Sequence, residues 1–164
     1  MPSLPSILIR DAVPADRPTI VEFNRRLAVE TENKVLDLAI LDQGVARALA
    51  EPDRLRYWVA ETTAAESNRV VGQTAVTREW SDWRNGWIWW LQSVYIHSEF
   101  RGQGIFRSLY RHIYYQAIET NVIGLRLYVE NGNLRAQQAY QALGMKPGGY
   151  SVLEELWLDR SRLD

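Results

Sequence analysis

The chain carries its strongest strand signal in Trp87–His97, WIWWLQSVYIH, and the polar loop Ser98–Gly104, SEFRGQG, follows it directly. The strand segment is rich in aromatic and β-branched residues, which favour extended backbone. After the loop, apolar residues recur at helical spacing to about Thr120, which predicts a helix. This apolar stripe consists of Ile105, Leu109, Ile113 and Ala117, with Phe106, Tyr110 and Tyr114 beside it. The strand, loop and helix together form the unit around which the rest of the fold is arranged.

The segments before and after this unit predict further strands and helices. Upstream, strands are expected at residues 7–10, 57–61 and 70–77, helices at about 14–30 and 38–50, and an Asn-Gly hairpin turn within 82–86. Downstream, a strand is expected at 124–129, a helix at 133–143 ended by Gly144, and a final strand at 150–158. The order predicts an α/β (α+β) fold with antiparallel pairing early and a parallel crossover late. We expect one domain over residues 1–164.

Composition excludes several classes of site. The 164 residues include no cysteine and two histidines, which excludes disulfides, thiolate metal sites and a cysteine nucleophile, and we expect no metal. The formal net charge of −1 offers no field that would attract nucleic acid or an anionic membrane, and we expect neither as a partner. No apolar run is long enough to span a bilayer, and the N-terminus does not resemble a signal peptide, so a cytoplasmic location is expected.

The loop Arg101–Gly104 predicts an anion site. The first N–H groups of a helix lack internal partners and lie at the positive end of the helix dipole, and glycines let the backbone approach a phosphate closely. Arg107 and Arg111 add positive charge. The alternative interpretation is a glycine turn beside a solvated basic helix face. A P-loop is excluded because no Gly-Lys-Ser/Thr opens the helix, and a dinucleotide fingerprint is excluded because the loop follows several strands.

Two motifs of the chain resemble those of the GNAT superfamily of acyl-CoA-dependent N-acetyltransferases. The family's phosphate loop, Arg/Gln-x-x-Gly-x-Gly/Ala, is similar to Arg101-Gly102-Gln103-Gly104-Ile105-Phe106, which departs from it at Phe106. Its second signature, Asn-x-x-Ala-x-x-x-Tyr-x-x-x-Gly-Phe/Met, resembles residues Asn133–Met145 throughout. The two motifs occur in the expected order and context. The resemblance covers about residues 6–158 and implies a mixed, mostly antiparallel sheet that splays between its fourth and fifth strands and is flanked by helices.

The resemblance also implies a binding mode for acetyl-CoA, the acyl donor. The N–H of Val94 would donate to the thioester carbonyl and stabilise the oxyanion, and Tyr95 and Ile96 would contact the pantetheine amides. Pyrophosphate would be held by the amides of Arg101, Gly102, Gln103, Gly104, Ile105, Phe106 and Arg107, and Asn133 would also belong to the coenzyme site. Tyr140 would be the general acid that protonates the departing thiolate. The alternative for Tyr140 is an aromatic residue on the apolar face of its helix.

Candidates for the acceptor site come from the strand and from the first helix. Strict alternation would place Ile88, Trp90, Gln92, Val94 and Ile96 on one face of the strand and Trp87, Trp89, Leu91, Ser93 and Tyr95 on the other. Within the resemblance, Trp90 and Gln92 face the acceptor, and Glu30 and Glu32 end a helix that lines it. Glu79 is a further candidate base. For each of these acids a solvated surface charge is the commoner interpretation, and a water chain that carries the proton to bulk solvent is an equal alternative.

The tryptophan-rich segment Trp80–Trp90 has three interpretations: core packing on both sheet faces, an aromatic acceptor pocket, or base stacking with single-stranded nucleic acid. The neutral charge makes the last the weakest. Taken together, the sequence predicts an acetyl-CoA-dependent N-acetyltransferase that acts on the primary amine of a small molecule or peptide end in a ternary complex. The alternative is a non-catalytic acyl-CoA-binding sensor or scaffold. The resemblance also suggests a homodimer.

Overall fold

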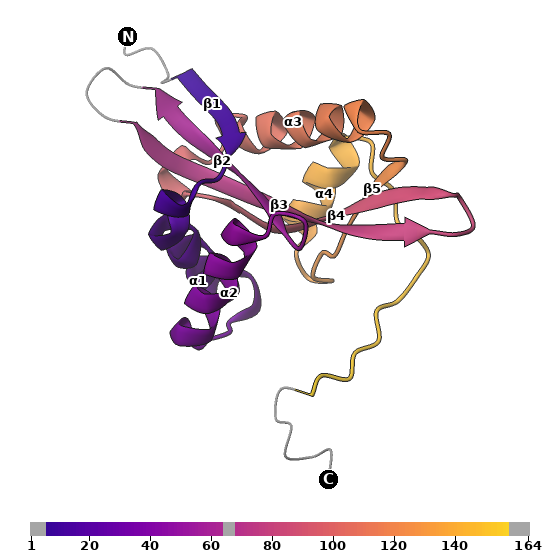
Figure 1. Ribbon diagram of the computed structural model, residues 1–164, viewed down its shortest axis with the longest axis horizontal. Helices are drawn as coiled ribbons and strands as arrows, with labels where there is room; N and C mark the ends of the chain where they lie inside the picture. Colours follow the sequence, from indigo (N-terminus) through magenta and orange to yellow (C-terminus); the bar gives the residue numbers. More distant parts are fainter. Residues whose placement is uncertain (1–5, 64–67, 158–164) are drawn as a thin grey trace. The chain divides into compact units, whose positions relative to one another are not determined.

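The computed structural model describes residues 6–63 and 68–157. Within them the chain forms five strands, four α-helices and two short 3-10 turns (Figure 1). In chain order these are β1 (Ser6–Asp11), η1 (Pro14–Asp16), α1 (Arg17–Glu32), α2 (Leu38–Ala50), β2 (Arg56–Thr63), β3 (Arg69–Ser81), β4 (Gly86–Ile96), η2 (Ser98–Phe100), α3 (Ile105–Glu119), β5 (Gly124–Leu127) and α4 (Leu134–Ala142). The predicted elements up to residue 143 are therefore all present, with ends shifted by a few residues.

The strands form one mixed sheet in the order β1-β2-β3-β4-β5. Neighbouring strands from β1 to β4 are antiparallel, whereas β4 and β5 are parallel and are joined through α3. The β4–β5 ladder runs only from Ile88–Gly124 to Leu91–Leu127, although β4 continues to Ile96. The predicted α/β fold, with a mixed sheet that splays between its fourth and fifth strands, is therefore confirmed.

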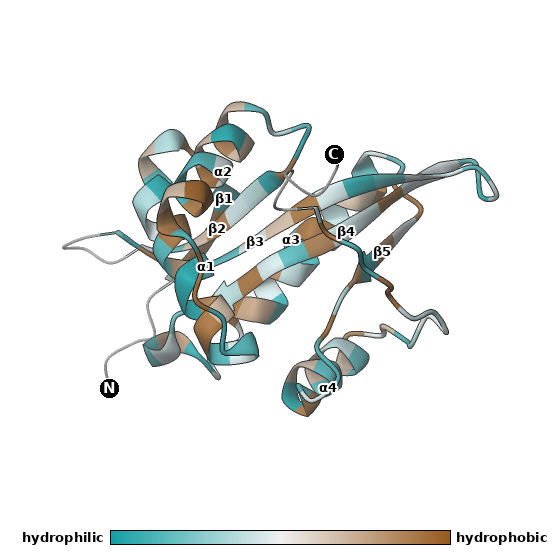
Figure 2. Ribbon diagram, turned by 90° about the horizontal axis from the view of Figure 1, so that it is seen from below, coloured by the Kyte–Doolittle hydropathy of each residue, from teal (hydrophilic) through white to brown (hydrophobic). Residues whose placement is uncertain are grey.

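Helices cover both faces of the sheet, with α1 and α2 over one and α3 over the other (Figures 1 and 2). Alternate residues of β2 point to the two faces of the sheet. Tyr57 and Val59 pack with Ile20 of α1 and Val45 of α2. Trp58 is fully buried and its ring lies 6.1 Å from that of His112 in α3. A strand covered on both faces reads as a continuous apolar run, which is why Tyr57–Ala60 has no polar residue.

Local capping explains where the helices begin and end. Asp37 precedes α2 and its carboxylate accepts from the N–H groups of Ala39 and Ile40, at 2.9 and 3.1 Å. Such a cap contributes about 1 kcal/mol. Asn33 ends α1 in the left-handed conformation (φ 51°), which asparagine tolerates better than most residues. The predicted hairpin within residues 82–86 is present between β3 and β4, but Gly86 already pairs with Ser81, so the turn is the four-residue loop 82–85, which ends with Asn85 in the same left-handed conformation (φ 50°).

The residues divide into two compact units, one that ends at Asn133 and one that begins at Leu134. The second contains α4, followed by Gly144 in the left-handed conformation (φ 95°), as expected of a helix-ending glycine. The single domain over residues 1–164 stays a prediction.

The predicted strand at 150–158 is wrong for the described residues Tyr150–Trp157, which form no strand, and Leu158 lies outside the description. Val152 and Leu153 are adjacent apolar residues and two glutamates follow them, so the alternation that a half-buried strand requires is broken.

Candidate active site

The loop between β4 and α3 has the backbone that the sequence predicts for an anion site. Gly102 and Gly104 both have positive φ, 77° and 80°, which glycine adopts without steric cost. A Cβ on either would meet no atom within 4 Å, so the space is open on the side where a side chain would project. Gly104 is the N-cap of α3, and no acidic residue occupies the first turn of this described helix. The first-turn N–H groups and the helix dipole therefore suit a phosphate group.

Arg101 ties this loop to the sheet and to α1. Its Nε donates to the Ile96 carbonyl at 2.9 Å, and its Nη2 donates to Glu30 Oε2 at 2.6 Å. The guanidinium also lies 5.3 Å from the centre of the Tyr95 ring. The Arg101 side chain thus fixes the entry to the loop, and its contribution to an anion would come through its backbone and its positive charge.

Glu30 joins the same network from the end of α1. Its second oxygen, Oε1, accepts from the Tyr95 hydroxyl at 2.9 Å, so both carboxylate oxygens are engaged. Partial burial alone would raise the pKa of Glu30, but the hydrogen bonds from Arg101 and Tyr95 outweigh it and the pKa lies below its usual range. Burial and Glu30 together raise the pKa of Tyr95. The charged carboxylate and neutral phenol thus hold α1, β4 and the loop together.

A β-bulge lies between the two halves of β4. Ala75 is opposite Gln92, whereas Gln73 is opposite Tyr95, so two residues of β4 oppose one of β3. Ser93 in the bulge has a φ of 52°. The buried Gln73 amide donates to the Ser93 carbonyl at 3.2 Å and to Asn24 Oδ1 of α1 at 2.9 Å. These bonds fix the irregular backbone.

The bulge overturns the strict alternation expected along β4. Ala75 packs with α1 and α2, so its cross-strand partner Gln92 shares that face. Tyr95 is on the same face, because it contacts Phe23 and Glu30 of α1. The Ile96 side chain lies on the α3 face, where a Cβ on Gly72 would come within 2.7 Å of it. An inserted residue reverses the faces of everything after it, which a period of two cannot anticipate.

The bulge precedes the part of β4 that has separated from β5. Val94, Tyr95 and Ile96 all follow Leu91, the last β4 residue paired with β5. Tyr95 and Ile96 still pair with β3 on the other side, opposite Gln73 and Gly72. One edge of this segment is therefore bonded to the sheet. No described strand pairs with the other edge, where Arg101 bonds the Ile96 carbonyl, and an extended ligand could add there as a strand does.

A cluster of four side chains lies where β4 and β5 begin to separate; we call it the Glu79 cluster, and it consists of Glu79, Trp90, Arg126 and Tyr128. Glu79 Oε2 accepts from the Trp90 indole N–H at 2.5 Å, and Arg126 Nη1 donates to both Glu79 oxygens at 3.0 and 3.2 Å. The Trp90 and Tyr128 rings have centroids 4.5 Å apart. The hydrogen bond from Trp90, supported by Arg126, outweighs a slight desolvation and lowers the pKa of Glu79.

Other predicted site residues are placed as follows. Gln92 Nε2 donates to Thr77 Oγ1 at 2.8 Å, and Glu32 is exposed and pairs with Lys34 at 2.5 Å. In the loop, Gln103 Nε2 donates to the Glu99 carbonyl at 3.2 Å. In the first turn of α3, Ile105 is buried in the core and Arg107 is exposed. The Phe106 ring lies 6.3 Å from that of Tyr110. The backbone N–H of Asn133 donates to the Glu130 carbonyl at 3.0 Å. Burial raises the pKa of Tyr140 in α4.

The tryptophans have separate environments. Trp89 packs on Trp58 in the core at 6.0 Å, Trp87 and Trp80 form an edge-to-face pair on the hairpin, and Trp83 at its tip is 86% exposed. Trp90 alone joins the Glu79 cluster. The sequence did not single out Arg126 and Tyr128, because their relation to Glu79 arises only from strand pairing between segments about 47 residues apart.

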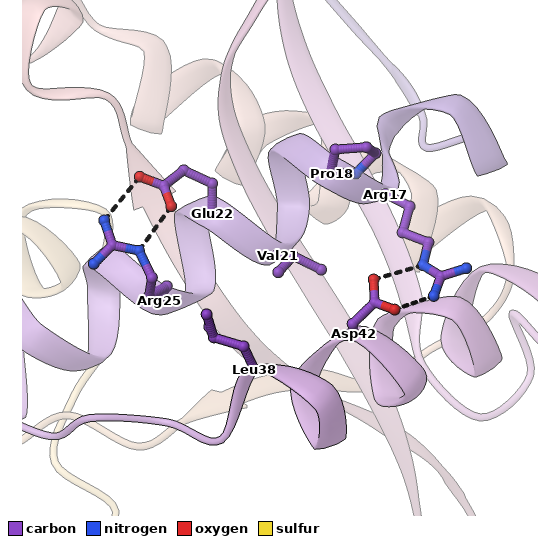
Figure 3. A pocket seen from close by; sticks show the side chains of 7 residues that line it. All are labelled: Arg17, Pro18, Val21, Glu22, Arg25, Leu38 and Asp42. Carbon is purple, nitrogen blue, oxygen red and sulfur yellow. Dashed lines mark hydrogen bonds and ion pairs between the residues drawn. The ribbon is translucent and has the colours of Figure 1, made fainter.

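A separate open hollow of about 550 Å³ lies between α1 and α2, away from the loop (Figure 3). Its lining residues are Arg17, Pro18, Val21, Glu22, Arg25, Leu38 and Asp42. The charged ones pair with one another, Arg17 with Asp42 and Arg25 with Glu22. The hollow contains none of the predicted site residues.

Residues 6–63 and 68–157 contain no group of three or more histidine, aspartate or glutamate side chains arranged to hold a metal ion. Within the same residues, every helix is too short or too polar to cross a membrane.

Comparison with known proteins agrees with this geometry. The model of the acetyltransferase (GNAT) family matches residues 20–145. Thialysine N-epsilon-acetyltransferase of Bos taurus is 31% identical over 144 residues, which is 84% of this chain and 83% of the relative. The Sus scrofa enzyme of the same name is 29% identical over 147 residues, 86% of this chain and 85% of the relative.

Solved structures give the same result. A protein of Clostridium difficile 630, described as a possible acetyltransferase, superimposes with a TM-score of 0.83 at 40% identity, covering 93% of this chain and 99% of its own. Glucosamine-6-phosphate N-acetyltransferase of Arabidopsis thaliana shares the fold, with a TM-score of 0.69 at 17% identity over 94% of this chain and 99% of its own. The phosphate-type loop, the splayed strand and these similarities lead to one conclusion: the chain belongs to the acetyltransferase (GNAT) family.

Proposed function

We propose that the chain transfers an acetyl group from acetyl-CoA to a primary amine by direct attack within a ternary complex. The observation that carries the proposal is the glycine loop, open around Gly102 and Gly104, at the start of α3 and directly after a strand whose last residues have left β5. A diphosphate and an extended amide-bearing arm are the two ligand features that these two elements suit. The chain has no cysteine, so an acyl-cysteine intermediate is excluded.

In this proposal the backbone carries much of the chemistry. The amides from Gly102 to Arg107 hold the pyrophosphate, and the edge of Tyr95 and Ile96 that lies beyond the β4–β5 ladder bonds the pantetheine amides, next to the Ile96 carbonyl that Arg101 engages. The N–H of Val94 donates to the thioester carbonyl and stabilises the oxyanion when the amine attacks. Loss of a single such donor typically costs about 3–4 kcal/mol in the barrier.

We assign Tyr140 as the general acid that protonates the departing thiolate. Its raised pKa supports this role, because the phenol stays protonated throughout the neutral range and has a proton to give. The attacking amine loses its proton to water. The Glu79 carboxylate is held by Trp90 and Arg126, and its lowered pKa makes it a poor base.

Glu30 fits a positioning role better than the acceptor site that the sequence suggested. Both of its oxygens are engaged by Tyr95 and by Arg101, which fixes the entry to the glycine loop. Glu32, Trp90 and Gln92 stay candidates for the acceptor side. The relatives named thialysine N-epsilon-acetyltransferases support an aliphatic side-chain amine as the acceptor class. Homodimerisation and a cytoplasmic location stay predictions.

The test is thiol release from acetyl-CoA in the presence of a panel of primary amines, together with calorimetric titration of acetyl-CoA. Amine-dependent release supports the proposal. Binding of acetyl-CoA without release on any amine would favour the alternative, an acyl-CoA-binding sensor. The absence of any binding heat would overturn both.

A further inference from the structure

The Glu79 cluster occupies a position from which it can select the acceptor, given the proposed acetyl transfer on which this inference rests. Glu79 comes from β3, Trp90 from β4 and Arg126 from β5, and Tyr128 follows β5 directly. Trp90 pairs with Arg126 one step before the last β4–β5 pair. The cluster therefore borders the point where the strands separate, on the face of the sheet that Gln92 shares with α1.

The charges of the cluster form a balanced and accessible pair. The Arg126 and Glu79 side chains are 32% and 41% exposed, so both reach solvent. Both hydrogen bonds that Arg126 makes within the described chain leave from Nη1. A guanidinium has five N–H donors and a carboxylate about four acceptor positions, so each group has capacity for a ligand of opposite charge.

Aromatic rings flank this ion pair. The Trp90 and Tyr128 rings are inclined at 31°, and the Arg126 guanidinium lies 5.8 Å from the centre of the Trp90 ring. Tyr128 is 61% exposed and presents its ring to solvent. The indole N–H of Trp90 fixes Glu79 from the other side. Such rings can pack against an aliphatic stem and attract an ammonium group.

We propose that the Glu79 cluster binds the zwitterionic head group of an amino-acid acceptor, with Arg126 holding the α-carboxylate, Glu79 holding the α-ammonium, and the side-chain amine receiving the acetyl group. The charge pattern distinguishes this ligand from simpler amines. A diamine places a second cation beside Arg126, and a carboxylate without an α-ammonium places an anion beside Glu79. A zwitterion pairs both groups at once.

The distance along β4 limits the length of the acceptor. Trp90 and Val94 are four residues apart, which is at most about 13 Å in a strand and less across the bulge. An acceptor whose head group is held at the cluster therefore needs an extended side chain, such as that of lysine, to bring its amine toward Val94.

Three acceptors of matched length test the proposal: lysine, 1,5-diaminopentane, which lacks the carboxylate, and 6-aminohexanoate, which lacks the α-amine. We expect the wild-type kcat/KM for lysine to exceed both others by about 10- to 100-fold, the usual effect of one charge-assisted hydrogen bond. Arg126→Met should abolish the preference for lysine over 1,5-diaminopentane. Glu79→Gln should abolish the preference for lysine over 6-aminohexanoate.

The matched control is a second arginine–carboxylate pair, Arg78 with Asp53, whose nitrogen and oxygen lie 3.1 Å apart. Arg78 precedes Glu79 in β3, so alternation directs its side chain to the face of the sheet opposite the Glu79 cluster. Arg78→Met and Asp53→Asn should keep the wild-type order of acceptors. Arg126→Lys keeps the positive charge but loses the planar guanidinium that can donate two parallel hydrogen bonds to a carboxylate. This variant should give an intermediate preference for lysine over 1,5-diaminopentane.

Calorimetry separates this inference from the proposed function. Lysine titrated into protein saturated with free coenzyme A cannot react, so any heat reports acceptor binding alone. Binding that weakens about tenfold or more in Arg126→Met supports the head-group site. Turnover of all three acceptors with equal kcat/KM, or equal losses for all three in both variants, would overturn the inference and leave acetyl transfer standing. Failure of every amine to release thiol would instead overturn the proposed function.

Discussion

At the scale of single residues, the chemistry of the proposed site depends on which charged groups are already paired. Glu30 and Glu79 looked alike in the sequence, as acids near a proposed active site. In the structure Glu30 has both oxygens engaged by Tyr95 and Arg101, whereas Glu79 belongs to a half-exposed pair beside aromatic rings. Their surroundings tie Glu30 to the loop before α3 and place Glu79 in the cluster that we propose for the acceptor.

Glu30→Gln should weaken acetyl-CoA binding by about 3- to 10-fold and change the acceptor KM little. The amide still accepts one hydrogen bond but loses the charge that holds Arg101, so the loop entry loosens; a charged partner typically adds about 1 kcal/mol or more. Calorimetric Kd values and the two KM values measure the effect. Glu51→Gln removes another arginine-paired carboxylate, after α2, and serves as the control. A selective rise in the acceptor KM would return Glu30 to the acceptor site.

Tyr140→Phe should lower kcat by about 10²–10³-fold and leave the Kd of acetyl-CoA nearly unchanged, because only the proton donor is lost. The raised pKa of Tyr140 adds a pH prediction: the wild-type rate should lose no activity to phenol ionisation until the pH exceeds the ordinary tyrosine pKa of about 10. Tyr115→Phe, on the exposed side of α3, is the matched control. An unchanged kcat in Tyr140→Phe would remove this tyrosine from the mechanism.

At the scale of secondary-structure elements, one inserted residue in β4 and two glycines before α3 create the proposed binding geometry. The bulge moves Tyr95 to the α1 face, where it meets Glu30, and Gln73 and Asn24 hold it there. The glycines give the loop before α3 its two positive φ angles, and a Cβ at either position would meet no atom within 4 Å. Both features are departures from regular structure; the bulge directly follows the last β4–β5 pair, and the glycines follow the end of β4.

Gly104→Asp and Gly104→Asn form a pair of nearly equal size that differ in charge, and both residues tolerate the left-handed backbone that Gly104 adopts. We expect the aspartate variant to bind acetyl-CoA at least about tenfold more weakly than the asparagine variant, because its charge opposes a pyrophosphate at the helix N-terminus. Gly44→Asp, in the open middle of α2, controls for added charge elsewhere. Equal Kd values for the two Gly104 variants would mean that the phosphates bind elsewhere.

At the scale of the whole molecule, arginine–carboxylate pairs join elements that are distant in sequence. Arg10 of β1 bonds Asp16 and Glu61, at 2.8 and 3.0 Å. Arg17 of α1 pairs with Asp42 of α2, and Arg101 with Glu30. The chain has only two histidines, His97 and His112, and a net charge near zero. We therefore expect the free energy of unfolding to depend on pH through these ion pairs and the two histidines.

The free energy of unfolding should fall steadily as the pH drops below about 6.5. Burial lowers the pKa of His97 and His112, so the folded state favours their neutral forms and this stabilisation is lost as the pH falls through the ordinary histidine range. The hydrogen bonds from Arg25 and Arg26 lower the pKa of Glu22 to about 2, so its contribution is present above about 4.5 and is lost between about 4.5 and 2.

Urea unfolding at pH 7, 5.5, 4 and 3 measures this dependence. The midpoints should decline in that order, and 0.5 M salt should reduce the decline below pH 4.5 because surface pairs are screened. A midpoint that rises on acidification would contradict the assigned directions of these pKa shifts.

The sequence by itself determined the local structure and the family. Apolar periodicity, the hairpin within residues 82–86 and the helix-ending Gly144 depend on neighbours within a few residues, and these predictions are confirmed up to Gly144. Glycine spacing after a strand likewise encodes the backbone of an anion loop, because positive φ at residues 102 and 104 is a local property.

Only the tertiary structure decided which side chains meet. The bulge at Ser93 depends on a register between β3 and β4 and on Gln73, and it reversed the expected faces of Tyr95 and Ile96. Arg126 joined Glu79 through parallel pairing across β4, and Glu30 met Arg101 across 71 residues of chain. Residues 150–157 read as a strand, yet the described sheet gives them no partner. Pairing between distant segments is a property of the assembled sheet, so no short-range pattern could have predicted these contacts.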